Sequence, residues 1–326
     1  MTAIPLYSPS RASSALWKTA QAIGVAATAV LMAGLLVRPD LALFVLWNVL
    51  IPLVPISLMV SPLIWRNVCP LATLNMAFNR QSARKLTNGL AARAGVVSLA
   101  LLAILVPARR FALNSDGTSL AIVIVAVGLL ALILGVVFDA KAGFCNAICP
   151  VLPVERLYGQ SPLLQVPNAR CPSCSLCTQR GCIDLAPEKS VAQKLGVARQ
   201  STAWLRTGFG AFAAAFPGFI VGYYTSSDVA LSAAGSVYLY MTTWSLGSYA
   251  LISVLVHIFR LGSKLALLLL GGLALSLYYW YVVEVVLTAM GIGGLWPMAS
   301  RGAALLLIGV WLTKALARVP VRGARS

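Results

Sequence analysis

Long apolar segments recur along the whole chain and constrain its fold more than any other feature of the sequence. A helix that crosses the hydrocarbon core of a bilayer needs about 20 mostly apolar residues. Eight segments meet this requirement, at residues 16–37, 41–63, 92–113, 119–138, 204–224, 236–259, 264–289 and 297–317. We therefore expect an all-α integral membrane protein with about eight transmembrane helices.

The composition excludes a soluble protein. Hydrophobic residues make up 60% of the chain and charged residues only 10%, whereas about 25% of the residues of a soluble domain are charged. The formal net charge of +17 would suggest a nucleic-acid ligand in a soluble protein. In a membrane protein the positions of Lys and Arg report topology instead, so we expect lipid and not nucleic acid as a partner.

The distribution of basic residues along the predicted helices indicates their orientation. Four Lys and Arg residues fall on one side, at Arg38, Arg109, Arg110 and Arg301, and all others fall on the opposite side or at the termini. Cytoplasmic loops are enriched in Lys and Arg. We therefore expect both termini on the cytoplasmic side of a bacterial inner membrane. Arg11 and Lys18 precede a first apolar segment of full spanning length, so we interpret that segment as a retained helix.

All seven cysteines fall in two predicted cytoplasmic loops, at residues 65–91 and 139–203. This divides the chain into helices 1 to 4 at 1–138, a cytoplasmic cysteine-rich segment at 139–203, and helices 5 to 8 at 204–326. An internal repeat is also visible, because a shift of 80 residues aligns WRNVCPL at 65–71 with CNAICPV at 145–151. The repeat predicts that Cys69 and Cys149 lie at equivalent depths at one membrane face.

The strongest chemical signal is the run Cys171-x2-Cys174-x2-Cys177-x4-Cys182. Three closely spaced cysteines with a nearby fourth are typical of a ferredoxin-like [4Fe-4S] loop. The last gap is one residue longer than in bacterial ferredoxins. Cys182 is followed directly by Ile183, and the next proline is Pro187. Zinc sites favour two pairs separated by a longer arm, and disulfides are rare in the reducing cytoplasm.

A second group consists of Cys145-x3-Cys149-Pro150 after one span and Cys69-Pro70 after another. These three thiols could meet at the inner membrane surface and hold a second [4Fe-4S] cluster. The candidates for its fourth ligand are Cys182, Asp139, His257 and a residue of a partner protein. If Cys182 joins this second cluster, Cys149 could complete the first one. The simpler alternative is one cluster plus three cysteines that serve as small buried hydrophobes.

The order of span, Cys-x3-Cys-Pro and ferredoxin-like run resembles the membrane-bound [4Fe-4S] proteins of the NapH, NosR and CcoG type. The resemblance covers about residues 41–190 and is most specific in FCNAICPVLPVERLYGQSP at 144–162. It implies that the redox residues are Cys145, Cys149, Cys171, Cys174, Cys177 and Cys182, with Cys69 as the remaining half of a first motif. Trp65 replaces that motif's first cysteine, a single ferredoxin-like run is present, and the chain has no separate flavin-binding domain.

These patterns favour an electron carrier over an enzyme with its own substrate, since no catalytic dyad or nucleotide fingerprint is visible. The expected partners are a ferredoxin, a flavodoxin or a membrane oxidoreductase subunit, with quinone as a further candidate. Haem is not expected, because His257 is the only histidine, and flavin is not expected, because no flavin-binding domain is visible. The alternative from another class is a copper- or zinc-handling transporter or assembly factor that uses the same cysteines.

One acidic residue lies inside a predicted span. An ionisable group within the membrane is a functional candidate by default, and Glu284 could take a proton at a quinone pocket beside Trp280 and Tyr281. We favour the structural alternative, in which Glu284 pairs with Arg301 near the outer face.

Overall fold

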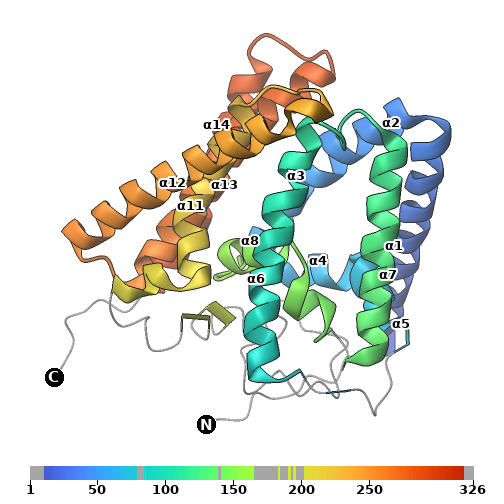
Figure 1. Cartoon of the computed structure of the whole chain (residues 1–326), viewed down its shortest axis with the longest axis horizontal. Helices are drawn as coiled ribbons and strands as arrows, with labels where there is room; N and C mark the ends of the chain where they lie inside the picture. Colours follow the sequence, from blue (N-terminus) through green and yellow to red (C-terminus); the bar gives the residue numbers. More distant parts are fainter. Residues whose placement is uncertain are drawn as a thin grey trace.

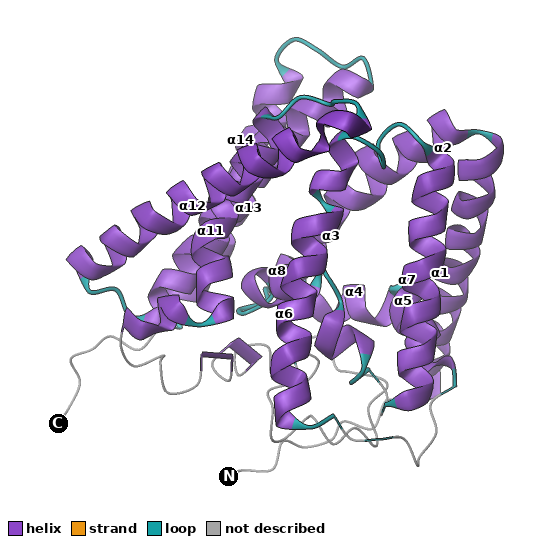
Figure 2. Ribbon diagram, viewed as in Figure 1, coloured by secondary structure: helices purple, strands orange, loops and turns teal. Residues whose placement is uncertain are grey.

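The computed structural model describes residues 11–78, 84, 86–138, 141–164, 183, 190–191, 194–195 and 202–318. This part of the chain is built from helices (Figures 1 and 2), with a single isolated bridge between Arg84 and Phe138. The first half contains α1 (Arg11–Val37), α2 (Pro39–Val45), η1 (Leu46–Leu50), α3 (Ile51–Val60), α4 (Pro62–Val68), α5 (Pro70–Ala77), α6 (Asn88–Leu105), η2 (Pro107–Arg110), α7 (Gly117–Val137), η3 (Phe144–Ile148) and α8 (Leu152–Tyr158). The second half contains η5 (Thr202–Arg206), α11 (Gly208–Thr225), η6 (Leu231–Ala233), α12 (Ala234–Phe259), α13 (Ser263–Ala289) and α14 (Trp296–Ala317).

Seven helical stretches in the described residues are long and apolar enough to cross a membrane. The protein is therefore an all-α, multi-pass membrane protein, as the apolar segments predict. The sequence predicts about eight spans. The predicted segment at 204–224 is not among the seven; it consists of η5 and α11, and α11 packs against α12 and α13.

The second span is not one regular helix. It consists of α2, a π-helical turn at η1, and α3, which contains Pro55. The Tyr279 hydroxyl from α13 enters this irregular stretch, accepting a hydrogen bond from the Ile56 amide at 2.9 Å and donating one to the Pro52 carbonyl at 2.8 Å. In a regular helix these two backbone groups would bond to each other, so the tyrosine side chain completes the backbone pairing at a kink.

Replacing Tyr279 with phenylalanine is expected to lower the free energy of unfolding by about 1–3 kcal/mol, because two backbone groups lose their partner away from water. The change is measurable as a lower thermal midpoint of the purified protein. Tyr281→Phe is the matched control, since no hydrogen bond of its hydroxyl is part of this kink. Equal midpoints for the two variants would show that the Tyr279 hydroxyl does not support α3.

The second span ends before a proline. Ser61 has an extended backbone, with φ −164° and ψ 113°, because the residue before a proline is disfavoured in the helical region. The chain then forms the short helices α4 and α5, which lie low in the bundle in Figure 1, between α3 and α7. Because the span breaks here, Cys69 and Pro70 lie at the junction of α4 and α5.

The basic residues divide between the two ends of the bundle as the sequence predicts. Arg38, Arg109, Arg110 and Arg301 belong to the upper end in Figure 1, where α2, η2 and the start of α14 lie. There Arg110 pairs with Asp228 at 2.9 Å, and the Arg109 guanidinium lies 3.7 Å from the centre of the Trp47 ring. The start of α1, the end of α14 and the short helices α4 and α5, between which Cys69 lies, are toward the opposite end.

Candidate metal centre

Three cysteines from two distant parts of the chain meet at the lower end of the bundle. Cys145 is buried in an apolar cluster with Ala72 of α5 and Ala131 of α7, and Cys69 and Cys149 pack against the same cluster. The two helices approach closely here, because a side chain at Gly135 of α7 would clash with the Asn75 backbone of α5. The structure therefore places these three cysteines around one apolar cluster.

Cys69 and Cys149 have nearly the same backbone conformation. Their φ and ψ angles are −58° and 123° for Cys69 and −53° and 123° for Cys149. Each cysteine ends a helical turn, precedes a proline, and is followed by a short helix, α5 in one case and α8 in the other. The following proline explains the shared conformation, and the match agrees with the 80-residue repeat at this position.

The turns that carry the two cysteines differ by one residue. The Cys69 amide donates to the Trp65 carbonyl, four residues earlier, whereas the Cys149 amide donates to the Phe144 carbonyl, five residues earlier. The wider π-helical turn of η3 contains Cys145. Turns of this kind are frequent at functional sites, and here the turn carries the cysteine that the first copy of the repeat lacks.

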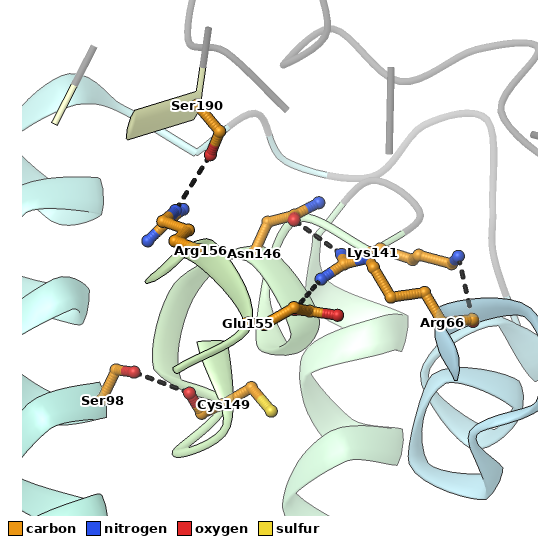
Figure 3. A network of polar contacts seen from close by, with 8 residues as sticks. All are labelled: Arg66, Ser98, Lys141, Asn146, Cys149, Glu155, Arg156 and Ser190. Atoms are coloured by element: carbon orange, nitrogen blue, oxygen red, sulfur yellow. Dashed lines mark hydrogen bonds and ion pairs between the residues drawn. The ribbon is translucent and has the colours of Figure 1, made fainter. Parts of the chain in front are cut away.

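A buried polar network joins the two copies of the repeat beside the cysteines (Figure 3). Arg66 donates to Glu155 at 2.6 Å and to Asn146 at 2.7 Å, and the Lys141 ammonium donates to the Arg66 carbonyl at 3.3 Å. The Arg66 and Glu155 side chains are only 4% and 3% exposed. Arg66 and Asn146 occupy equivalent positions in the repeat, so the two motifs contact each other through matching residues.

The third span is also tied to this site. The Ser98 hydroxyl of α6 donates to the Cys149 carbonyl at 2.6 Å (Figure 3). Ser98 is 1% exposed, so the bond forms away from water. The bond fixes the position of α6 along its axis relative to the Cys149-Pro150 turn.

Burial dominates the chemistry of the three thiols. Burial raises the pKa of Cys69 and Cys145, and it raises the pKa of Cys149 to about 12. Glu155 raises the pKa of Cys69 and Cys149 further, while the Arg66 charge lowers the pKa of all three. The thiols are thus protonated at neutral pH without a metal, and metal binding has to release their protons.

One buried side chain next to the cysteines has unmet hydrogen-bonding capacity. Asn67 is 1% exposed, and within the described part of the chain neither its amide nitrogen nor its side-chain oxygen has a partner. It lies two residues before Cys69. An orphaned polar group of this kind is expected where a further polar or charged group belongs. The Asn67 side-chain amide, the three soft sulfur donors and the Arg66 charge are the types of group that bind and stabilise an iron-sulfur cluster.

The ligand set around these cysteines is incomplete within the described residues. No three side chains of His, Cys, Asp or Glu in the described ranges are grouped to hold a metal ion. A cubane binds each thiolate to a different iron, so its ligands spread more widely than those of one ion. Several predicted ligands lie outside the described residues, namely Cys171, Cys174, Cys177, Cys182 and Asp139.

His257 is not brought to this site. It lies exposed in the last turn of α12, where its ring Nδ1 is 2.7 Å from the Ser253 carbonyl oxygen. That distance makes the ring nitrogen a donor to the preceding turn of its own helix. The structure therefore supports the capping interpretation of His257 and not its candidacy as a cluster ligand.

Glu284 forms the expected ion pair. Its carboxylate lies 2.8 Å from the Arg301 guanidinium, which also donates to the Trp280 carbonyl at 2.7 Å. The Glu284 side chain is 51% exposed, so it is not enclosed in a proton-transfer pocket.

Replacing Glu284 with glutamine is therefore expected to leave quinol-dependent reduction of the protein unchanged, because the carboxylate serves a pair at the helix ends. The rate of reduction by a soluble quinol, followed spectroscopically, measures this. A rate that falls tenfold or more in the variant would assign the carboxylate a role in proton transfer instead.

Three charged residues of the site are not predicted by the sequence motifs. Glu155 is the buried acid among the described residues, and Arg66 and Lys141 are 4% and 2% exposed. The distribution of basic residues indicates only topology for Lys141 and Arg66, and no motif gives Glu155 a role. The available signal was the acid itself, since the chain has only 8 Asp and Glu residues and this one follows a Cys-Pro motif by six positions.

No protein-family model, curated protein or solved structure matches the chain.

Proposed function

We propose that this protein carries electrons through [4Fe-4S] clusters held by its cysteines at the basic end of the helical bundle. One observation carries the proposal. Cys69, Cys145 and Cys149, which come from segments about 80 residues apart, converge beside a buried arginine that bridges both segments. Thiols and a cation gathered in one dry site suit an anionic thiolate-ligated cluster better than simple packing.

Two ligand sets are proposed. Cys171, Cys174 and Cys177 hold one cluster with Cys182 or Cys149, and Cys69 and Cys145 contribute to a second cluster with whichever of these two remains. A bound [4Fe-4S] cluster accepts and releases one electron at a potential set by its surroundings. The seven cysteines leave the second cluster with three thiolates in either arrangement, so we propose that Asp139 or a partner protein supplies its fourth ligand.

The chain's own residues set the electrostatics of the site. The Arg66 guanidinium stabilises thiolates at all three neighbouring cysteines, and Glu155 holds it in place. The Ser98 bond to the Cys149 carbonyl holds the Cys-Pro turn against α6. Apolar neighbours keep water out, which makes the potential sensitive to nearby charges and hydrogen bonds.

We infer that the cysteine-bearing end faces the cytoplasm of a bacterial inner membrane, because that end carries most of the basic residues. A ferredoxin, a flavodoxin or a membrane oxidoreductase subunit is the proposed redox partner, and quinone is a further candidate. Exposed cations such as Arg84 would attract an acidic partner, and this attraction weakens as salt rises.

The test is a metal and sulfide analysis of the full chain after anaerobic purification. The proposal expects about eight iron and about eight sulfide ions per chain, four of each for every cluster. Stoichiometric copper or zinc without iron would replace it with the metal-handling function. Neither metal in the folded protein would mean that the cysteines only pack.

A further inference from the structure

An apolar groove opens between α6, α11 and α12. It encloses about 490 Å³. Leu99 and Ala103 line it from α6, Phe212 and Phe216 from α11, and Met241 from α12. The groove is large enough for part of an acyl chain and too apolar for a soluble polar ligand.

The walls of the groove leave little hydrogen-bonding capacity for a ligand. Rings of α11 line one wall, with the centroids of Phe212 and Phe216 4.8 Å apart. The hydroxyls of Tyr238, Ser245 and Tyr249 each already donate to a backbone carbonyl of the protein. An occupant of the groove is therefore held by dispersion and burial of apolar surface.

A cation lies at the lower end of this groove. Gly95 and Leu99 share one face of α6 because they are four residues apart, and Leu99 is the first residue of α6 to line the groove. The Lys194 ammonium nitrogen lies 3.6 Å from the position that a Cβ of Gly95 would take. Gly95 itself lies about one helical turn, or about 5.4 Å along the axis, before Leu99.

The Lys194 charge has no acidic partner in the described part of the chain. Burial and the neighbouring Arg156 charge lower the pKa of Lys194 to about 8. A lysine that is partly buried beside another cation is in an environment that favours an anion. Arg206 ends η5 two residues before Gly208, which also lines the groove, and adds positive charge at the same end.

We propose that the groove binds an anionic glycerophospholipid, with its phosphate at Lys194 and an acyl chain between α6, α11 and α12. The apolar groove accounts for the tail and the cation at its end accounts for the headgroup. Ser98, which directly precedes the groove-lining Leu99 on α6, donates a hydrogen bond to the Cys149 carbonyl. A lipid in the groove therefore supports the same helix that positions the cysteine site.

Two substitutions test the two halves of the site separately. Lys194→Gln removes the headgroup charge and is expected to weaken binding of dioleoylphosphatidylglycerol about tenfold, as the loss of one charge-assisted hydrogen bond would. Ala103→Phe fills the groove from an exposed position and is expected to weaken binding similarly. Lys264→Gln, an exposed lysine at the same end, and Ala250→Phe, an exposed alanine of α12, are the matched controls.

Binding is measured by native mass spectrometry of the delipidated full chain titrated with dioleoylphosphatidylglycerol, dioleoylphosphatidylcholine or inorganic phosphate. We expect the phosphatidylglycerol to bind the wild type and both controls at least tenfold more tightly than phosphatidylcholine. Equal binding of the two lipids, or unchanged binding by Lys194→Gln and Ala103→Phe, would overturn the proposal. Phosphate that competes as well as the lipid would also overturn it. The readout does not depend on iron, so it fails or succeeds independently of the proposed electron transfer.

Discussion

Replacing Arg66 with methionine is expected to destabilise the protein by about 3–5 kcal/mol, because the substitution leaves the buried Glu155 carboxylate without its cation. The two side chains are 2.6 Å apart and almost fully enclosed. The same substitution removes the charge that stabilises thiolates at Cys69, Cys145 and Cys149. We therefore also expect it to remove most of the iron held by these cysteines, measured as iron per folded chain.

Two further variants separate the effect on folding from the effect on the thiols. Replacing both Arg66 and Glu155 by methionine and leucine is expected to restore most of the stability, since an apolar pair can substitute for a buried ion pair. Its iron content should stay low, because the positive charge is still missing. Arg66→Lys keeps the charge and should retain more iron than Arg66→Met. Full iron in the double variant would show that Arg66 acts only through folding.

Replacing Cys145 with serine is expected to remove about half of the bound iron and leave the other half in place. A serine hydroxyl is a hard donor that is not ionised at neutral pH, and iron-sulfur clusters require soft thiolates. Cys69→Ser is expected to have the same effect, because the two cysteines are assigned to the same cluster. Iron, sulfide and the visible absorption of each purified variant give the measurement.

The control for these serine variants is Thr73→Ala. The Thr73 hydroxyl donates to the Cys69 carbonyl at 3.2 Å, so the change perturbs the same turn without removing a thiol. It should keep all of its iron. Full iron in Cys145→Ser or Cys69→Ser would remove these two cysteines from the ligand set and leave one cluster in the run from Cys171 to Cys182.

The long helices of the fold were predictable, whereas their interruptions were less so. The sequence predicts spans at 264–289 and 297–317, and the structure has helices at Ser263–Ala289 and Trp296–Ala317. Composition alone suffices for these because the membrane imposes the length. The predicted span at 92–113 is offset from the span at Gly89–Arg110, within which α6 ends at Leu105 and a 3₁₀ turn starts at Pro107. Hydropathy values carry no information about the backbone hydrogen bond that Pro107 cannot donate, so they do not predict where α6 ends.

Some residues of the site were likewise predictable from the sequence, and others were not. The Cys-Pro motifs and the 80-residue repeat predict that Cys69 and Cys149 lie at equivalent positions, and their matching backbone angles agree with this. The partnership of Arg66 with Glu155 was not predictable, because it depends on how the two copies pack together. The repeat does align Arg66 with Asn146, and their direct contact shows that aligned polar residues can meet across the interface between copies.

The most direct test of the central claim is low-temperature electron paramagnetic resonance of the anaerobically purified chain during stepwise reduction. The account predicts signals of reduced [4Fe-4S] clusters that integrate to about two spins per chain. A fully reduced, folded protein that shows no iron-sulfur signal would contradict it, whatever other metal the cysteines hold.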